Sequence, residues 1–200
     1  MRALIALATL VLLSGQAAAE MVDHIKTEYE PLVNTEAGRI DSCGIIFASA
    51  VRTLAGRLLI VKGSVSSTFW KENLPGVLVK LTVWDFKGQA DPVPLKVYYA
   101  SMRVKDLDTR PMRQVEGENG GMLLGGDLAK HEKLTLDFPT MFMSGAWVSF
   151  SLDTKIRDYN FRLPAFGEGN DGTFREYMQC AQLGLEEKVN EMEALARTIK

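Results

Sequence analysis

Two cysteines, Cys43 and Cys180, constrain the fold of this chain more than any other feature. Cys43 begins the first strongly apolar segment, and Cys180 lies close to the C-terminus. Two cysteines in an exported protein are typically joined, because export leads to an oxidising compartment. A disulfide between them would fasten the last segment of the chain to its first strand and restrict the unfolded chain by as much as about 5 kcal/mol. The alternative is a pair of buried, reduced thiols.

Residues 1–19 have the features of a secretory signal peptide. Arg2 supplies the positive charge, residues 3–13 form an apolar core, and small residues at 17–19 form the cleavage site. The apolar core is much shorter than the roughly 20 residues that a bilayer-spanning helix requires. We therefore predict cleavage after Ala19 and a periplasmic or secreted protein without a stable membrane anchor.

The charge pattern argues against several classes of partner. The chain has 23 basic and 25 acidic residues, and the two signs are interspersed along it. A protein that binds nucleic acid needs a basic patch or a strongly positive domain. We therefore expect no nucleic-acid partner and no electrostatic attraction to anionic lipid.

Alternating apolar residues predict β-strands over most of the chain. In the clearest strand, Val77, Val79, Leu81 and Val83 fall on one face. Glycine, proline, asparagine and aspartate separate the segments, as expected for turns. Further strands are predicted within residues 43–51, 57–70, 93–104, 112–116, 133–138, 146–152 and 159–163.

These segments predict one mainly β domain over residues 40–200. Short strands without helical crossovers favour a single antiparallel β-sandwich of the Ig-like kind, with a partly open barrel as the alternative. Residues 20–39 are polar, and Pro31 would interrupt a helix, so we expect an N-terminal arm there.

Residues 173–199 change period from two to 3.6 and predict an amphipathic helix. Thr173 and Glu176 form a capping box at its start. We expect the apolar stripe to pack on the sheet as far as Leu185, beyond which it is either core or a seam for another helix. Cys180 lies at the edge of the stripe, and Gly184 would allow a close approach or a bend. The stripe consists of Phe174, Tyr177, Met178, Ala181, Leu185, Val189, Met192, Leu195, Ala196 and Ile199.

Two apolar segments lie where loops are predicted, and they are the candidate binding residues. One is a tip framed by glycines, and the other follows the predicted strand at 133–138. Apolar loop tips can contact a protein, a lipid or an apolar ligand, or they can fold back and cap the sandwich. The six residues are Met122, Leu123, Leu124, Met141, Phe142 and Met143.

No catalytic residue, metal site or cofactor is predicted. His24 and His131 are the two histidines; neither has the spacing of a metal ligand or lies in a nucleophile motif. The glycine-rich segments do not follow the spacing of a phosphate-binding loop.

The sequence therefore predicts a non-catalytic binding protein of the cell envelope. Its expected partner is an envelope or secreted protein, bound through the apolar loops or the C-terminal helix. The alternative is a module that binds a small apolar ligand or a lipid. A third possibility is a hydrolase based on the acid pairs Asp106/Asp108 or Glu168/Asp171.

Overall fold

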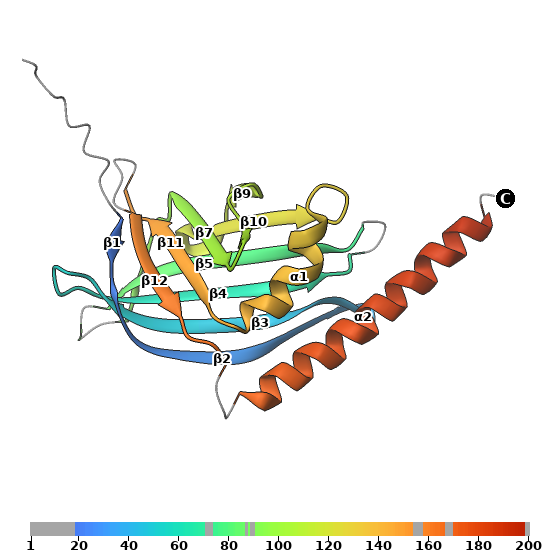
Figure 1. Cartoon of the computed structure of the whole chain (residues 1–200), viewed down its shortest axis with the longest axis horizontal. Coiled ribbons are helices and arrows are strands. Elements are labelled where there is room, and N and C mark those ends of the chain that lie inside the picture. Colours follow the sequence, from blue (N-terminus) through green and yellow to red (C-terminus); the bar gives the residue numbers. More distant parts are fainter. Residues whose placement is uncertain are drawn as a thin grey trace, which may run out of the picture.

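Two β-sheets packed face to face form the body of the protein, and a long C-terminal helix runs along one side of it (Figure 1). The computed structural model describes residues 19–70, 74–86, 88, 91–153, 158–166 and 170–198. The predicted signal peptide lies outside the described residues except for Ala19.

The larger sheet has seven strands in the order β2-β3-β4-β5-β10-β9, with β6 also paired to β5. All its pairs are antiparallel. A short 3₁₀ helix, Glu118–Gly120, precedes β10. The strands are β2 (Asp23–Glu36), β3 (Arg39–Arg52), β4 (Leu58–Thr68), β5 (Gly76–Phe86), β6 (Val93–Leu95), β9 (Arg113–Glu116) and β10 (Met122–Asp127).

The smaller sheet has five strands in the order β1-β12-β11-β7-β8. Its pairs are antiparallel except for β1 and β12, and the predicted hairpin at 146–163 is present as β11 and β12. The strands are β1 (Glu20–Met21), β7 (Tyr99–Val104), β8 (Leu107–Asp108), β11 (Ala146–Ser151) and β12 (Asp158–Leu163). The predicted mainly β sandwich with a C-terminal helix is confirmed, and the described strands do not close into a barrel.

Residues 20–39 are not an arm. They form β1, β2 and the turn that leads into β3, and β2 pairs with β3 along its whole length. The polar composition and Pro31 misled the prediction, because β2 is an edge strand with only one neighbour in its sheet. Proline and charged side chains are tolerated on an edge strand, where one row of backbone groups needs no partner strand.

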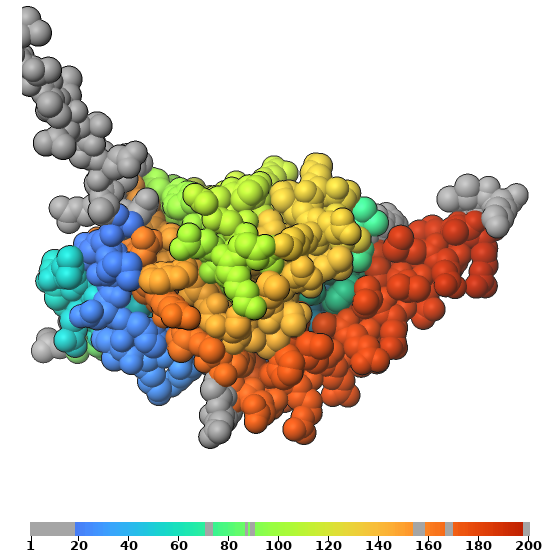
Figure 2. Space-filling view, viewed as in Figure 1, coloured from blue at the N-terminus to red at the C-terminus, as the bar shows by residue number. Residues whose placement is uncertain are grey.

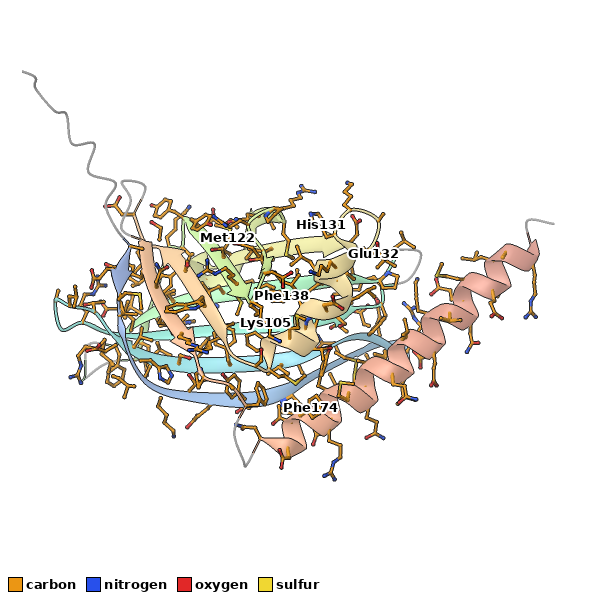
Figure 3. All side chains as sticks on the ribbon, viewed as in Figure 1. Lys105, Met122, His131, Glu132, Phe138 and Phe174 are labelled. Atoms are coloured by element: carbon orange, nitrogen blue, oxygen red, sulfur yellow. A yellow bond between two sulfur atoms is a disulfide. The ribbon has the colours of Figure 1, made fainter. Side chains whose placement is uncertain are left out.

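The predicted strand at 133–138 is a helix, α1 (Glu132–Phe142). Leu134, Phe138 and Phe142 follow each other at intervals of four residues, and all three are buried. This helix contacts strands of both sheets, so that Phe138 points into the core between them (Figure 3). The alternation of Leu134, Leu136 and Phe138 suggested period two, but Leu136 is exposed on the outer side of the helix.

The C-terminal helix, α2 (Asp171–Thr198), is fastened to β3 by the predicted disulfide. Cys43 and Cys180 are 137 positions apart in sequence, and their Cα atoms lie 5.8 Å apart. Figure 1 shows the C-terminal turns of α2 projecting beyond the strands. No helix among the described residues is long and apolar enough to cross a membrane.

Candidate functional site

A narrow face of α2 holds the helix against the sandwich. Tyr177, Cys180 and Gly184 are buried on this face. Gly184 allows a close approach, because a Cβ atom there would lie 2.6 Å from the ring of Phe69. The hydroxyl groups of Tyr177 and Ser67 are 3.4 Å apart, which joins the first turns of α2 to the end of β4.

Polar contacts hold the same face nearer the C-terminus of α2. Lys188 is only 3% exposed, and its Nζ donates to the backbone oxygen of Trp70 at 3.0 Å. It also lies 3.0 Å from the Glu191 carboxylate, which in turn contacts Arg39 at 3.1 Å. A buried ammonium group is tolerated only when it is paired and hydrogen-bonded. These contacts therefore fix the rotation of α2 about its axis.

The predicted apolar stripe of α2 packs on the body only in part: Tyr177 is buried and Ala181 packs against the core, whereas Phe174, Met178 and Leu185 are exposed. Ile199, the last residue of the predicted stripe, lies outside the described residues. Six large apolar side chains of α2, named at the end of this paragraph, are between 40% and 50% exposed. On a helix with 3.6 residues per turn, all of them except Leu195 lie about 100° around the axis from the buried face. Leu195 continues the line of the buried face towards the C-terminus of α2. The prediction was wrong for Phe174, Met178 and Leu185, because it assumed that the whole apolar face must be docked. The exposed residues are Phe174, Met178, Leu185, Val189, Met192 and Leu195, named here the α2 stripe.

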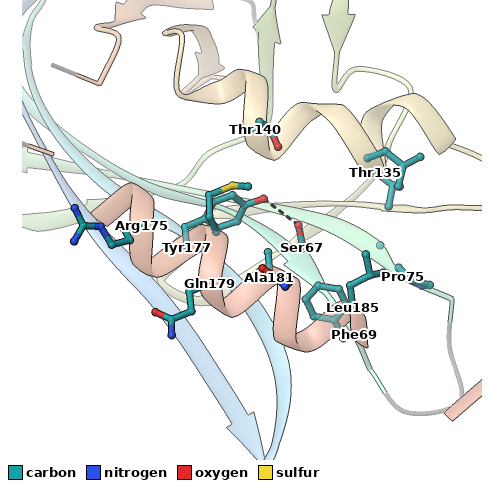
Figure 4. A pocket seen from close by; sticks show the side chains of 14 residues that line it. Ser67, Phe69, Pro75, Thr135, Thr140, Arg175, Tyr177, Gln179, Ala181 and Leu185 are labelled. Atoms are coloured by element: carbon teal, nitrogen blue, oxygen red, sulfur yellow. Dashed lines mark hydrogen bonds between the residues drawn. The ribbon is translucent and has the colours of Figure 1, made fainter. Parts of the chain in front are cut away.

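Part of the α2 stripe forms one wall of a groove of about 650 Å³, named here the α1–α2 groove (Figure 4). Met178 and Leu185 contribute to the α2 wall, and Leu136 of α1 contributes to the opposite wall. Phe69 and Pro75 also line it, from the segment between β4 and β5. The C-terminal turns of α2 extend beyond the body of the protein (Figure 2). A surface of this kind can take up an apolar segment of another molecule.

Residues 122–124 form a strand and not a loop tip. They begin β10, where Met122 and Leu124 are buried in the core and Leu123 is half-buried on the outer face. The glycines that suggested a turn have a different role. A Cβ atom at Gly121 would lie 2.6 Å from the backbone oxygen of Leu81, so glycine permits close packing there.

Residues 141–143 also differ from the predicted loop. Met141 and Phe142 belong to the last turn of α1, and Met143 caps it. Phe142 is 1% exposed and packs against the rings of Phe47 and Tyr29, whereas the two methionines are half-buried against the core. The three residues help to fill the core between the sheets, and none of them lines the α1–α2 groove.

Burial affects two tyrosines near these helices. It raises the pKa of Tyr177 above its ordinary value of 10, although hydrogen bonds to Ser67 and Thr140 act in the opposite direction. Burial also raises the pKa of Tyr29, whose hydroxyl donates to the backbone oxygen of Pro164 at 2.7 Å. Both phenols are therefore neutral over the physiological range of pH.

Both members of the first acid pair considered for hydrolysis are engaged in ion pairs with basic side chains. Asp106 lies 2.6 Å from Lys133, and Asp108 lies 2.7 Å from Arg110. The hydrogen bond from Lys133 lowers the pKa of Asp106, which keeps this carboxyl ionised near neutral pH, without a proton to donate. Glu168, one member of the second pair, lies outside the described residues.

The two histidines lie far from the α2 stripe in the sequence and in different elements. His24 is on the edge strand β2, where its Nε2 is 2.6 Å from the hydroxyl of Thr27. His131 precedes α1, and its Nδ1 is buried without a hydrogen-bond partner in the described structure. No group of three or more His, Cys, Asp or Glu side chains in the described parts of the chain is arranged to hold a metal ion.

Comparisons with protein-family models, with curated proteins and with solved structures found no match to this chain. Its function is therefore inferred from its own geometry.

Proposed function

We propose that this chain is an exported, non-catalytic binding protein of the cell envelope, periplasmic or secreted, that recognises an amphipathic segment of another protein. The observation that carries the proposal is the exposed α2 stripe on a helix that the sandwich holds by a different face. A contiguous apolar surface of this kind on a soluble domain typically marks an interaction site.

The rigidity of α2 supports a binding role. The disulfide and the buried Lys188 hold the helix from its second turn to near Glu191, so the stripe is presented in one fixed orientation. A preorganised surface loses little conformational entropy when a partner binds. The disulfide also fits an oxidising compartment, as the signal-like N-terminus predicts.

The length of the α2 stripe favours a helix as the occupant. Phe174 and Leu195 are separated by about 30 Å along the helix axis, at 1.5 Å per residue. The α1–α2 groove covers only the first part of this length, because Val189, Met192 and Leu195 do not line it. An amphipathic helix laid alongside α2 would contact both parts, with apolar residues spaced by three and four positions.

A second candidate is an acyl chain or another small apolar ligand in the α1–α2 groove. The groove volume of about 650 Å³ lies within the range of small-molecule sites. This ligand would leave the outer half of the α2 stripe uncovered, which distinguishes it from a protein partner.

Site-specific photo-crosslinking in cells that export the protein tests the proposal. A photoreactive residue at Met178, Leu185 or Met192 should form an adduct with one polypeptide. The same residue at Leu183 or Asn190, which are exposed on other sides of α2, should not. Equal labelling at all five positions would contradict the proposal, and an adduct of lipid mass at Met178 alone would support the second candidate.

A pair of matched variants separates binding from folding. Leu183 and Leu185 are 47% and 49% exposed on the same helix, so Leu→Ser at either position should leave the melting temperature nearly unchanged. We expect Leu185→Ser to remove the crosslink from Met178 and Leu183→Ser to retain it. A large loss of stability in Leu185→Ser alone would show that Leu185 is part of the core.

A further inference from the structure

The outer face of the five-stranded sheet carries a second concave site, which shares no lining residue with the α1–α2 groove. A groove of about 260 Å³ lies over β7, β11 and β12, and most of the side chains that line it are polar or charged. Neighbouring strands place some of these side chains in two rows that cross the sheet, and Arg162, which does not line the groove, ends the second row. This site requires no contribution from α2, so the inference is independent of the proposed function.

Hydroxyl and amide groups form the first row. Ser149 of β11 pairs with Asn160 of β12 on one side and with Ser101 of β7 on the other. Neighbouring strands are spaced by about 4.8 Å, so the row offers donors and acceptors at regular intervals. The Oδ1 atom of Asn160 is buried and has no hydrogen-bond partner within the described structure. Such an atom is usually paired, and Asn160 is one of the residues that line the groove.

An aromatic ring between two arginines forms the second row. Trp147 of β11 pairs with Arg162 of β12 and with Arg103 of β7, and both arginines are exposed. Opposed residues on adjacent strands share a face of the sheet, so the indole lies between two guanidinium groups. The row combines a flat apolar surface with cations that can bind a carboxylate through two hydrogen bonds.

The charge of the groove favours an anion. Among the described residues, Asp108 is the one carboxylate that lines the groove. It already accepts hydrogen bonds from the Arg110 backbone N–H at 2.9 Å and from the Arg110 Nε at 2.7 Å. Arg103, which also lines the groove, therefore adds a positive charge that this ion pair does not neutralise.

We propose that this groove binds an acidic sugar, of the uronic acid class. The serine hydroxyls and the Asn160 amide match the hydroxyl groups of a sugar, Trp147 provides a surface for the face of the ring, and Arg103 binds the carboxylate. A neutral sugar would leave the arginine without a partner, and a small inorganic anion would use neither the ring surface nor the hydroxyl row.

Titration of the full protein with a glucuronic acid trisaccharide and with its neutral glucose counterpart tests the proposal, with calorimetry or tryptophan fluorescence as the readout. The acidic sugar should bind at least about tenfold more tightly, because the charge-assisted contact is lost with the neutral one. Arg103→Met should lower affinity for the acidic sugar by a similar factor, and Trp147→Phe should lower it less.

Arg113→Met serves as the matched control, because Arg113 is an exposed strand arginine on β9 in the other sheet. This variant should bind the acidic sugar as the unmodified protein does. Equal affinity for the two trisaccharides, an unchanged affinity in Arg103→Met, or sulfate binding as tight as that of the acidic sugar would overturn the proposal.

Discussion

At the scale of single residues, Gly184 determines how closely α2 can approach the sandwich. The hydrogen of this glycine faces the ring of Phe69, and Ile40 lies on the same side. The disulfide at Cys180 holds α2 one turn before Gly184. The helix therefore cannot easily shift away from Phe69 to make room for an additional methyl group. The docking of α2 therefore depends on the absence of a side chain at position 184.

We expect Gly184→Ala to lower the free energy of unfolding by about 1–3 kcal/mol through overpacking against Phe69. Chemical denaturation, followed by circular dichroism, measures the change. Gly172→Ala is the control within the same helix, because a Cβ atom at Gly172 meets nothing within 4 Å. The control should be neutral or stabilising by less than about 1 kcal/mol. An equal slight stabilisation of both variants would show that helix propensity, and not packing against Phe69, determines the effect.

Tyr177 should make the stability of the protein depend on alkaline pH. Its pKa is raised in the folded state because of burial, so the folded protein holds the phenolic proton more tightly than the unfolded chain does. The resulting contribution of Tyr177 to the free energy of unfolding is fully present below pH 10, and it is lost as the pH rises through the folded-state pKa of the phenol. The fall in melting temperature above pH 10 should be smaller in Tyr177→Phe, and identical curves would exclude this role. Tyr29, shifted in the same direction, should account for part of the remaining fall.

The cysteine pairing and the close approach at Gly184 could be predicted from single residues, but the role of Lys188 could not. A lysine in a helix sequence normally indicates a solvated position. Lys188 is buried because the Trp70 carbonyl and the Glu191 carboxylate meet at the same place in the folded chain. Only tertiary structure brings these acceptors together.

At the scale of elements, the boundaries of α2 were predictable from its sequence, whereas its rotation was not. Periodicity reports which face is apolar, but it does not report which face is docked. In this protein the disulfide, Gly184 and Lys188 decide the docked face, and the α2 stripe is left exposed. For α1, the spacing of Leu134, Phe138 and Phe142 indicated a helix, but Pro139 and a local alternation favoured a strand with a following loop.

We expect Lys188→Met to lower the free energy of unfolding by about 1–3 kcal/mol, because the Trp70 carbonyl loses a charged donor in a buried place. Arg197→Met is the control. Arg197 forms an exposed ion pair with Glu193 on the same helix, and its loss should change stability by less than about 0.5 kcal/mol. Thermal unfolding of both variants measures the difference. Equal stabilities would show that Lys188 does not hold α2 in place.

At the scale of the whole molecule, the sandwich supports two separate surfaces. Most of the side chains that were predicted to lie in binding loops instead belong to the core between the sheets, including Leu124 and Phe142, whereas Leu123 is half-buried on the outer face. The predicted mainly β fold follows from alternating residues, which repeat along many strands. The surfaces depend on how elements that are distant in the sequence meet in the fold. The α1–α2 groove could therefore be identified only from the structure.

Oxidative footprinting of the methionines tests the central claim most directly, because the chain provides both exposed and buried methionines. Met178 and Met192 are 42% and 46% exposed on the α2 stripe, whereas Met102 is 1% exposed in the core. In the purified protein, Met178 and Met192 should be oxidised rapidly and Met102 should be protected. In intact cells that export the protein, the two stripe methionines should become protected by the partner. Protection of Met178 and Met192 in the purified monomer, to the level of Met102, would contradict the account.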